Sequence, residues 1–308
     1  MDRYCPKCFE RFQTGVDSCP HDGSALVSFA DRDLVGETLD GRYEIQARVG
    51  RGGMGVVYRA LHSVIGRTVA LKVLNSDAVK DETALKRFLV EGRAMASLKN
   101  PHTITLYDFG ATSTGLLYYT MELLEGKPLS TILREDGRLA PERAVDFVLQ
   151  TCESLEEAHR KQIVHRDLKP DNIFVVREDG TGREFVKVLD FGIAKLMGEK
   201  PVGTLTATGV VCGTPAYLSP EQVMGGDIGP PSDLYSLGVV LYEMLGGRRP
   251  FSGKTSMEVL LKHLNEPVPP FTTFEAQVPV PGSLELFVRT ALAKQPAERF
   301  STVEEFCN

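Results

Sequence analysis

The residues best suited to chemistry lie in one short polar run, His165-Arg-Asp-Leu-Lys-Pro-Asp-Asn172. Within six residues it offers the carboxylate of Asp167, the ammonium group of Lys169 and the amide of Asn172. Such a loop could accept a hydroxyl proton, stabilise charge that develops on a phosphoryl group, and offer an oxygen ligand to a divalent metal.

A second carboxylate, Asp190 of Asp190-Phe-Gly192, follows the apolar run 185–189. A strand that ends there would present Asp190 as a ligand for a hard cation. The same tripeptide occurs at 108–110, where we interpret it only as the end of a strand. The tripeptide alone therefore decides nothing.

A glycine-rich run, Gly50-Arg-Gly52-Gly-Met-Gly55-Val-Val57, separates two predicted strands. Glycines let a backbone approach phosphate groups closely. A hairpin without a ligand would use similar residues, and a lone run of this type does not separate the two. In a dinucleotide-binding turn the glycines open a helix, whereas strand-like residues follow here.

Lys72 stands in the otherwise apolar run 69–74, where an unpaired ammonium group would be costly to bury. Glu91 borders the apolar stripe of the next predicted helix and is the candidate anionic partner. Two unrelated surface charges are the alternative.

The elements that must position these residues follow from hydrophobic periodicity. Short alternating runs broken by glycine predict antiparallel strands over 43–74, and a further strand pair is predicted over 103–110 and 116–124. Steps of three and four residues predict helices over 81–99 and over 141–160, the latter with proline in its first turn. Residues 232–244 are apolar nearly all round and predict a buried helix capped by Ser232.

The order and spacing of these motifs resemble a Hanks-type (eukaryotic-like) bacterial serine/threonine protein kinase over residues 43–306. The resemblance implies an α+β, bilobal kinase fold, with an antiparallel sheet and one helix in the first lobe and a mostly helical second lobe. It implies a kinase domain at 43–308, with the N-lobe at 43–121, the hinge at 122–126 and the C-lobe at 127–308. Residues 28–42, which are polar and acidic without a sustained period, are interpreted as a linker.

The resemblance also implies roles in the transfer of the γ-phosphoryl group of ATP. Lys72 would contact the α- and β-phosphates and be held by Glu91. Asp167 would take the proton of the substrate hydroxyl, and Lys169 would stabilise the phosphoryl group. Two residues would hold Mg²⁺ or Mn²⁺: Asn172 and Asp190. The residues that would bind ATP lie in the glycine-rich hairpin, in the neighbouring strands and in the hinge. They are Gly50, Gly52, Gly55, Val57, Ala70, Lys72, the gatekeeper Met121, Glu122 and Leu124.

Substrate class follows from the same resemblance. Lys169 and Thr214 match serine/threonine-specific kinases, so protein substrates that carry these hydroxyls are expected. Glu221 of Ser219-Pro-Glu221, where the family has Ala-Pro-Glu, should pair with Arg299. Asp233 would brace the backbone of the catalytic loop.

Threonines in the run 204–208 lie between the Asp190 motif and Glu221. Arg166 resembles the arginine that pairs with a phosphorylated activation loop. We therefore expect autophosphorylation at Thr206 or Thr208, for which two copies of the chain would pair as a homodimer. A solvated loop with incidental hydroxyls is the alternative.

Cysteines at the start of the chain, Cys5-Pro-Lys-Cys8 and Cys19-Pro-His21-Asp22, resemble a zinc ribbon over residues 1–27. The second turn lacks its second cysteine, so either His21 or Asp22 would supply the fourth ligand. Redox use of the first cysteine pair and three reduced thiols without a ligand are the alternatives. Such a module would dock a partner or regulate the enzyme.

Composition bounds the remaining classes. The chain of 308 residues has 42% hydrophobic and 25% charged residues and a net charge of −6, which argues against a nucleic-acid surface. Its most apolar run, 237–245, is about half of the ~20 residues that cross a bilayer, so no membrane span is expected.

We expect a cytoplasmic protein that continues past Asn308, where an anchor could lie. Two rival functions are a small-molecule phosphotransferase and a kinase-like scaffold without activity.

Overall fold

The structure is a computed structural model of the chain, and it describes residues 3–5, 11–12, 16–28, 33–52, 55–74, 90, 92–112, 116–178, 180–191, 215–273 and 280–308. The chain divides into two compact units. The first comprises residues 1–92 and 105–124, and the second comprises 93–104 and 125–308. Each unit has an architecture of its own.

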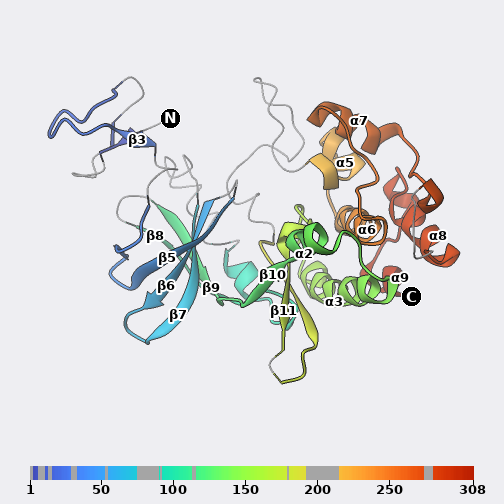
Figure 1. Cartoon of the computed structure of the whole chain (residues 1–308), viewed down its shortest axis with the longest axis horizontal. Helices are drawn as coiled ribbons and strands as arrows, with labels where there is room; N and C mark the ends of the chain where they lie inside the picture. Colours follow the sequence, from blue (N-terminus) through green and yellow to red (C-terminus); the bar gives the residue numbers. More distant parts are fainter. Residues whose placement is uncertain are drawn as a thin grey trace. The chain divides into compact units, whose positions relative to one another are not determined.

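Within its described residues, the first unit contains a six-stranded antiparallel sheet of order β4-β5-β6-β7-β9-β8 (Figure 1). The strands are β4 (Thr38–Leu39), β5 (Tyr43–Gly52), β6 (Gly55–His62), β7 (Arg67–Leu74), β8 (Leu106–Ala111) and β9 (Leu117–Met121). Alternation in β5 turns Tyr43 and Ile45 inward, and these side chains pack with apolar residues of β6 and β7 in one core. The predicted strands over 43–74 are confirmed.

Two details of this sheet differ from the sequence predictions. Leu34 and Leu39, in the predicted linker 28–42, are buried in the core, and β4 pairs with β5. The tripeptide 108–110 lies inside β8, which continues to Ala111, and there Asp108 accepts a hydrogen bond from Tyr43 (3.0 Å) and forms an ion pair with Arg42 (3.0 Å). The β4–β5 pairing joins Leu39 with Tyr43, which is nearby in the chain, whereas Asp108 and Tyr43 are 65 residues apart and no local pattern shows their contact.

A separate small sheet of order β2-β1-β3 is formed near the N-terminus by β1 (Arg3–Tyr4), β2 (Arg11–Phe12) and β3 (Val27–Ser28). Both of its strand pairs are antiparallel. Cys5, Cys19 and Leu26 are buried in a miniature core, against which Phe12 packs. The N-terminal segment thus has a local core.

The second unit is mostly helical and carries one small sheet of order β10-β11-β12 (Figure 1). Its strands are β10 (Gly126–Pro128), β11 (Ile173–Arg177) and β12 (Glu184–Val188). Its described helices are α2 (Leu129–Asp136), α3 (Pro141–Arg160), α5 (Pro220–Met224), α6 (Pro230–Gly246), α7 (Ser256–Asn265), α8 (Gly282–Ala291) and α9 (Val303–Cys307), with short 3₁₀ turns η3 (Pro170–Asn172), η4 (Pro215–Tyr217), η5 (Phe271–Thr273) and η6 (Pro296–Glu298).

Helix α6 is buried along most of its length, as its apolar sequence predicts. Its predicted start is wrong, because the helix begins at Pro230 and its N-cap residue is Gly229. Ser232 instead lies in the first turn, where its hydroxyl donates to Glu221 (2.6 Å). Of the predicted helix 81–99, residue 90 and residues 92–96 are helical, and positions 81–89 and 91 lie outside the described residues.

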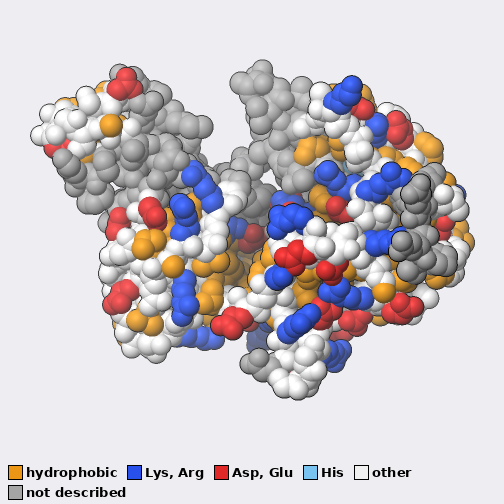
Figure 2. Space-filling view, viewed as in Figure 1, with side chains coloured by type: hydrophobic (Ala, Val, Ile, Leu, Met, Phe, Trp, Pro, Cys, Tyr) orange, Lys and Arg blue, Asp and Glu red, His pale blue; other side chains and the backbone are white. Residues whose placement is uncertain are grey.

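Surface charge is mixed. Figure 2 shows Lys and Arg interspersed with Asp and Glu on the face drawn, rather than gathered by sign. Among the described residues, no helix has both the length and the apolar character that a membrane crossing requires.

Candidate active site

The polar run of the second unit forms a compact loop between α3 and β11. Lys169 Nζ lies 2.7 Å from Asp167 Oδ2. The Asn172 amide nitrogen donates to the backbone carbonyl of Asp167 (2.7 Å). Both side chains of the acid–base pair are mostly buried, with 10% of Asp167 and 17% of Lys169 exposed. The loop therefore holds the ammonium group of Lys169 and the amide of Asn172 in direct contact with Asp167.

Helix α6 anchors this loop through Asp233, whose side chain is 1% exposed. Its carboxylate accepts hydrogen bonds from the backbone N–H groups of His165 and Arg166, both at 2.8 Å. His159, in the last turn of α3, lies 2.8 Å from the same carboxylate. The side chain of Gln222 donates to the Arg166 carbonyl (2.7 Å). Asp233 of α6 and Gln222 of α5 thus hold the loop backbone, and His159 of α3 contacts the Asp233 carboxylate.

Two residues have strained backbone conformations, one in this loop and one just after β12. Arg166 and Asp190 have positive φ values of 68° and 57°, a left-handed conformation that costs about 1–3 kcal/mol for residues other than glycine. Leu189, next to Asp190, donates its N–H to the Asn172 carbonyl (2.8 Å) and accepts from the His165 ring (2.8 Å). These bonds bring Asp190 out of β12 beside the catalytic loop.

The glycine-rich run of the first unit forms the β5–β6 hairpin, in which Gly50 pairs with Val57 and Gly52 with Gly55. A Cβ at Gly55 would lie 2.1 Å from the Val73 carbonyl oxygen, so packing itself requires glycine there. A Cβ at Gly50 or Gly52 would meet nothing within 4 Å. Internal packing does not explain those two glycines.

Lys72 lies on β7, paired with Val57 on one side and Tyr119 on the other, and is 7% exposed. Its ammonium nitrogen is 5.7 Å from the centre of the Tyr119 ring. Glu91, its predicted partner, lies outside the described side chains. Ala70 pairs with Met121 two register positions away on the same strands.

The predicted hinge begins where β9 ends. The backbone N–H of Glu122 donates to the Thr105 carbonyl (3.0 Å), and the Glu122 carboxylate accepts from the Thr105 N–H (2.8 Å). The N–H of Glu122 is therefore engaged within the protein.

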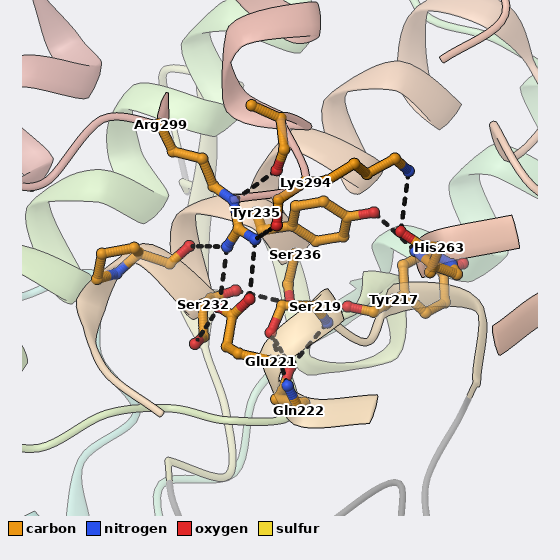
Figure 3. A network of polar contacts seen from close by, with 12 residues as sticks. Tyr217, Ser219, Glu221, Gln222, Ser232, Tyr235, Ser236, His263, Lys294 and Arg299 are labelled. Carbon is orange, nitrogen blue, oxygen red and sulfur yellow. Dashed lines mark hydrogen bonds and ion pairs between the residues drawn. The ribbon is translucent and has the colours of Figure 1, made fainter. Parts of the chain in front are cut away.

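A buried polar network links α5, α6 and α7 with Arg299, which follows η6 (Figure 3). Arg299 and Glu221 form the expected pair through two parallel hydrogen bonds of 2.8 Å. Burial acts to raise the pKa of Glu221, but hydrogen bonds from Arg299 and Ser232 hold it below its ordinary value. The pair joins elements that are 78 residues apart in the chain.

The same network contains His263. Its Nδ1 lies 2.9 Å from the Tyr235 hydroxyl, and its Nε2 lies 3.1 Å from the Ala216 carbonyl. The neutral ring with a proton on Nε2 satisfies both partners. Burial, and then the nearby charge of Lys294, lower the pKa of His263 to about 4.

Near the N-terminus, the ligand atoms of Cys5, Cys19 and Asp22 all lie within 4.8 Å of one another. The Cys5 sulfur donates to Asp22 Oδ2 (3.0 Å), and the His21 N–H donates to the Cys19 sulfur (3.4 Å). Hydrogen bonds from the Cys5 thiol and from Ser24 hold the pKa of Asp22 well below its usual range.

Several predicted residues lie outside the described residues: Cys8, Glu91, Gly192, Thr206, Thr208 and Thr214. Conversely, sequence reasoning missed His159 and Gln222 as supports of the loop. Their contacts span 74 and 56 residues. The only local hint is that His159 stands in the last turn of the helix that leads into the loop.

The six-stranded sheet of the first unit, together with the mostly helical second unit and its polar loop, defines a protein kinase fold. The family model described as "Protein kinase domain" matches residues 43–308, and the chain belongs to this family. The family and the α+β kinase fold predicted from the sequence are thereby confirmed.

Named relatives are bacterial. The chain is 40% identical over 278 residues to the serine/threonine-protein kinase PknA of Mycobacterium tuberculosis, covering 89% of the chain and 62% of the relative. It is 38% identical over 272 residues to PrkC of Bacillus subtilis, covering 88% and 40%. Pkn1 of Myxococcus xanthus is 39% identical over 308 residues, covering 100% and 43%. The chain thus spans less than two thirds of these relatives.

Among solved structures, the kinase domain of Mycobacterium tuberculosis PknI matches with a TM-score of 0.68 and 23% identity, covering 90% of the chain and 97% of that domain. Because the sequence identity is only 23%, this match supports the fold and not a shared function.

Proposed function

We propose that the chain is a serine/threonine protein kinase that transfers the γ-phosphoryl group of ATP to protein hydroxyls in the cytoplasm. The observation that carries this proposal is the arrangement of Asp167, Lys169 and Asn172 within hydrogen-bonding distance in a member of the protein kinase family. Asp167 takes the proton of the acceptor hydroxyl. The hydroxyl oxygen bonds to the γ-phosphorus, while the bond between the γ-phosphorus and the β–γ bridging oxygen breaks and ADP leaves. Lys169 stabilises the charge on the transferred group.

ATP binding draws on the first unit in this proposal. Lys72 meets the α- and β-phosphates with support from Glu91, and Gly50 and Gly52 admit the phosphates to the backbone. The latter is supported by the open space around both glycines, which leaves a ligand as the reason for their missing side chains.

A divalent metal fits the second unit's oxygen donors. The nitrogen of the Asn172 amide is engaged by the Asp167 carbonyl, so its oxygen is directed elsewhere and can serve as a ligand together with the Asp190 carboxylate. Magnesium or manganese bound there would neutralise charge on the phosphates.

Two rivals remain testable. A small-molecule phosphotransferase would need neither the Ser219-Pro-Glu221 segment nor Arg299, whereas both are built into a buried network here. A scaffold without activity would bind ATP and transfer nothing. The filled catalytic positions support transfer.

The decisive experiment compares the wild type with Asp167→Asn, using labelled ATP, magnesium, a generic protein substrate and the chain itself. We expect label on serine or threonine with the wild type, and a rate about 10²–10⁴-fold lower with the variant, the usual contribution of a general base. Asp171→Asn, an exposed change on the same loop, serves as the matched control. ATP binding by both proteins without transfer by either would favour the scaffold.

We further propose autophosphorylation at Thr206 or Thr208, in a homodimer, with Arg166 pairing to the phosphate. It is supported by the threonine-rich sequence and by the family. Mass spectrometry of an active preparation should find phosphate on one of the two residues. An active kinase with neither residue modified would contradict it.

We also propose that residues 1–27 bind zinc and dock a partner. Two buried thiols beside a carboxylate support this, together with Cys8 as a predicted ligand. Zinc measured in the purified chain at about one ion per molecule is the expected result.

A further inference from the structure

The sequence leaves open whether His21 or Asp22 accompanies the cysteines. The sulfur atoms of Cys5 and Cys19 and a carboxylate oxygen of Asp22 lie within 4.8 Å of one another. With Zn–S bonds near 2.3 Å and Zn–O bonds near 2.1 Å, a tetrahedral ion needs ligand atoms separated by about 3.5–3.8 Å. One ion could therefore bridge the three atoms after small shifts.

The turn that follows Cys19 directs Asp22 toward this point. Cys19 donates its N–H to the Ser24 carbonyl (2.8 Å), and Gly23, with a φ of 72°, donates to the Cys19 carbonyl (2.9 Å). One carboxylate oxygen of Asp22 accepts from the Ser24 N–H (2.8 Å), while the other lies 3.0 Å from the Cys5 sulfur. The turn thus occupies one oxygen and leaves the second facing the thiol.

His21 serves the cysteine through its backbone instead. Its N–H donates to the Cys19 sulfur (3.4 Å), a contact that would stabilise a thiolate. Its ring is exposed, with its centre 6.2 Å from that of Phe12. Among the described residues, the group that could hold a metal contains Asp22 and not His21.

We propose that Asp22, and not His21, is a ligand of a zinc ion bound with Cys5 and Cys19, an assignment that rests on the zinc binding proposed above. A carboxylate is a harder ligand than a thiolate, so the bond from zinc to Asp22 is expected to be weaker than the bonds to Cys5 and Cys19. Replacing Asp22 by cysteine, the residue that a complete ribbon has there, should tighten binding.

The test uses the whole chain, stripped of metal and titrated with zinc in competition with a chromogenic chelator, and with cobalt for its absorption spectrum. We expect Asp22→Ala to weaken zinc binding at least about tenfold, the loss that even an outer-shell partner typically causes. His21→Ala, the neighbouring control, should stay within about twofold of the wild type. Asp22→Cys should bind more tightly and strengthen the sulfur-to-cobalt absorption, a gain that misfolding cannot produce.

The outcomes distinguish the role of Asp22 from the proposal that residues 1–27 bind zinc. A wild type that binds neither metal overturns zinc binding altogether. Zinc that is retained by Asp22→Ala, or lost with His21→Ala alone, leaves zinc binding intact and overturns the role of Asp22.

Discussion

Glycines of the β5–β6 hairpin illustrate how one residue type serves two purposes. Gly55 is required by the Val73 carbonyl that a side chain would strike, whereas Gly50 and Gly52 face open space. The sequence predicts all three as phosphate-binding positions and cannot separate them, because the crowding at Gly55 comes from a strand 18 residues further along the chain. Only coordinates reveal that difference.

We predict opposite consequences for alanine at two of these positions. Gly52→Ala should change the free energy of unfolding by less than about 0.5 kcal/mol, as surface substitutions usually do, and yet raise KM for ATP. Gly55→Ala should cost about 1–3 kcal/mol, because the added methyl group overlaps backbone. Chemical denaturation and steady-state kinetics measure the two effects. An unchanged KM in Gly52→Ala would indicate a hairpin without a role in ATP binding.

At the scale of elements, helix α6 supports the backbone of the loop that carries Asp167. Asp233 supplies acceptors to two backbone N–H groups of the loop and to His159. This support also holds Arg166 in its strained left-handed conformation. The conformation of the loop therefore depends in part on the buried helix.

Asp233→Asn should expose that dependence. An amide places N–H groups against one of the backbone donors, which leaves buried donors unsatisfied and costs about 1–3 kcal/mol. We expect kcat to fall, with a smaller change in KM for ATP, because the loop loses its alignment. Asp227→Asn, an exposed change just before α6, is the matched control for unfolding and kinetics. Equal kcat values in the two variants would show that the loop keeps its shape without this anchor.

Elements with local signals were predictable from the sequence, and those fixed by distant contacts were not. Helix α3 runs over 141–160 as predicted, because proline in its first turn and its apolar stripe are both local. The start of α6 was missed because the Ser232 hydroxyl, a typical cap, bonds Glu221 instead. Likewise, the motif of residues 165–172 is visible in the sequence, whereas the hydrogen bond from Gln222 to Arg166 spans 56 residues and is not.

For the whole molecule, stability should depend on pH through the buried His263, which has no role in the proposed chemistry. His263 has a pKa of about 4 in the folded protein against an ordinary 6.5, since burial and then Lys294 disfavour its charged form. Between these values the unfolded chain binds the extra proton, so the stabilisation present above pH 6.5 is lost as the pH falls toward 4.

We predict that the wild type loses roughly 1–2 kcal/mol more than His263→Gln between pH 6.5 and 5, because one linked proton is worth about 1.4 kcal/mol per pH unit. Thermal unfolding at several pH values measures this difference, with His21→Gln as the control at an exposed histidine. Glu221, whose pKa is lowered, acts in the same direction but below about pH 4.5, and Glu243, whose pKa burial raises, acts in the opposite direction. Both are common to all three proteins, so the difference between the curves isolates His263. Parallel curves for the wild type and His263→Gln would mean that the buried ring remains able to take up its proton in the folded state.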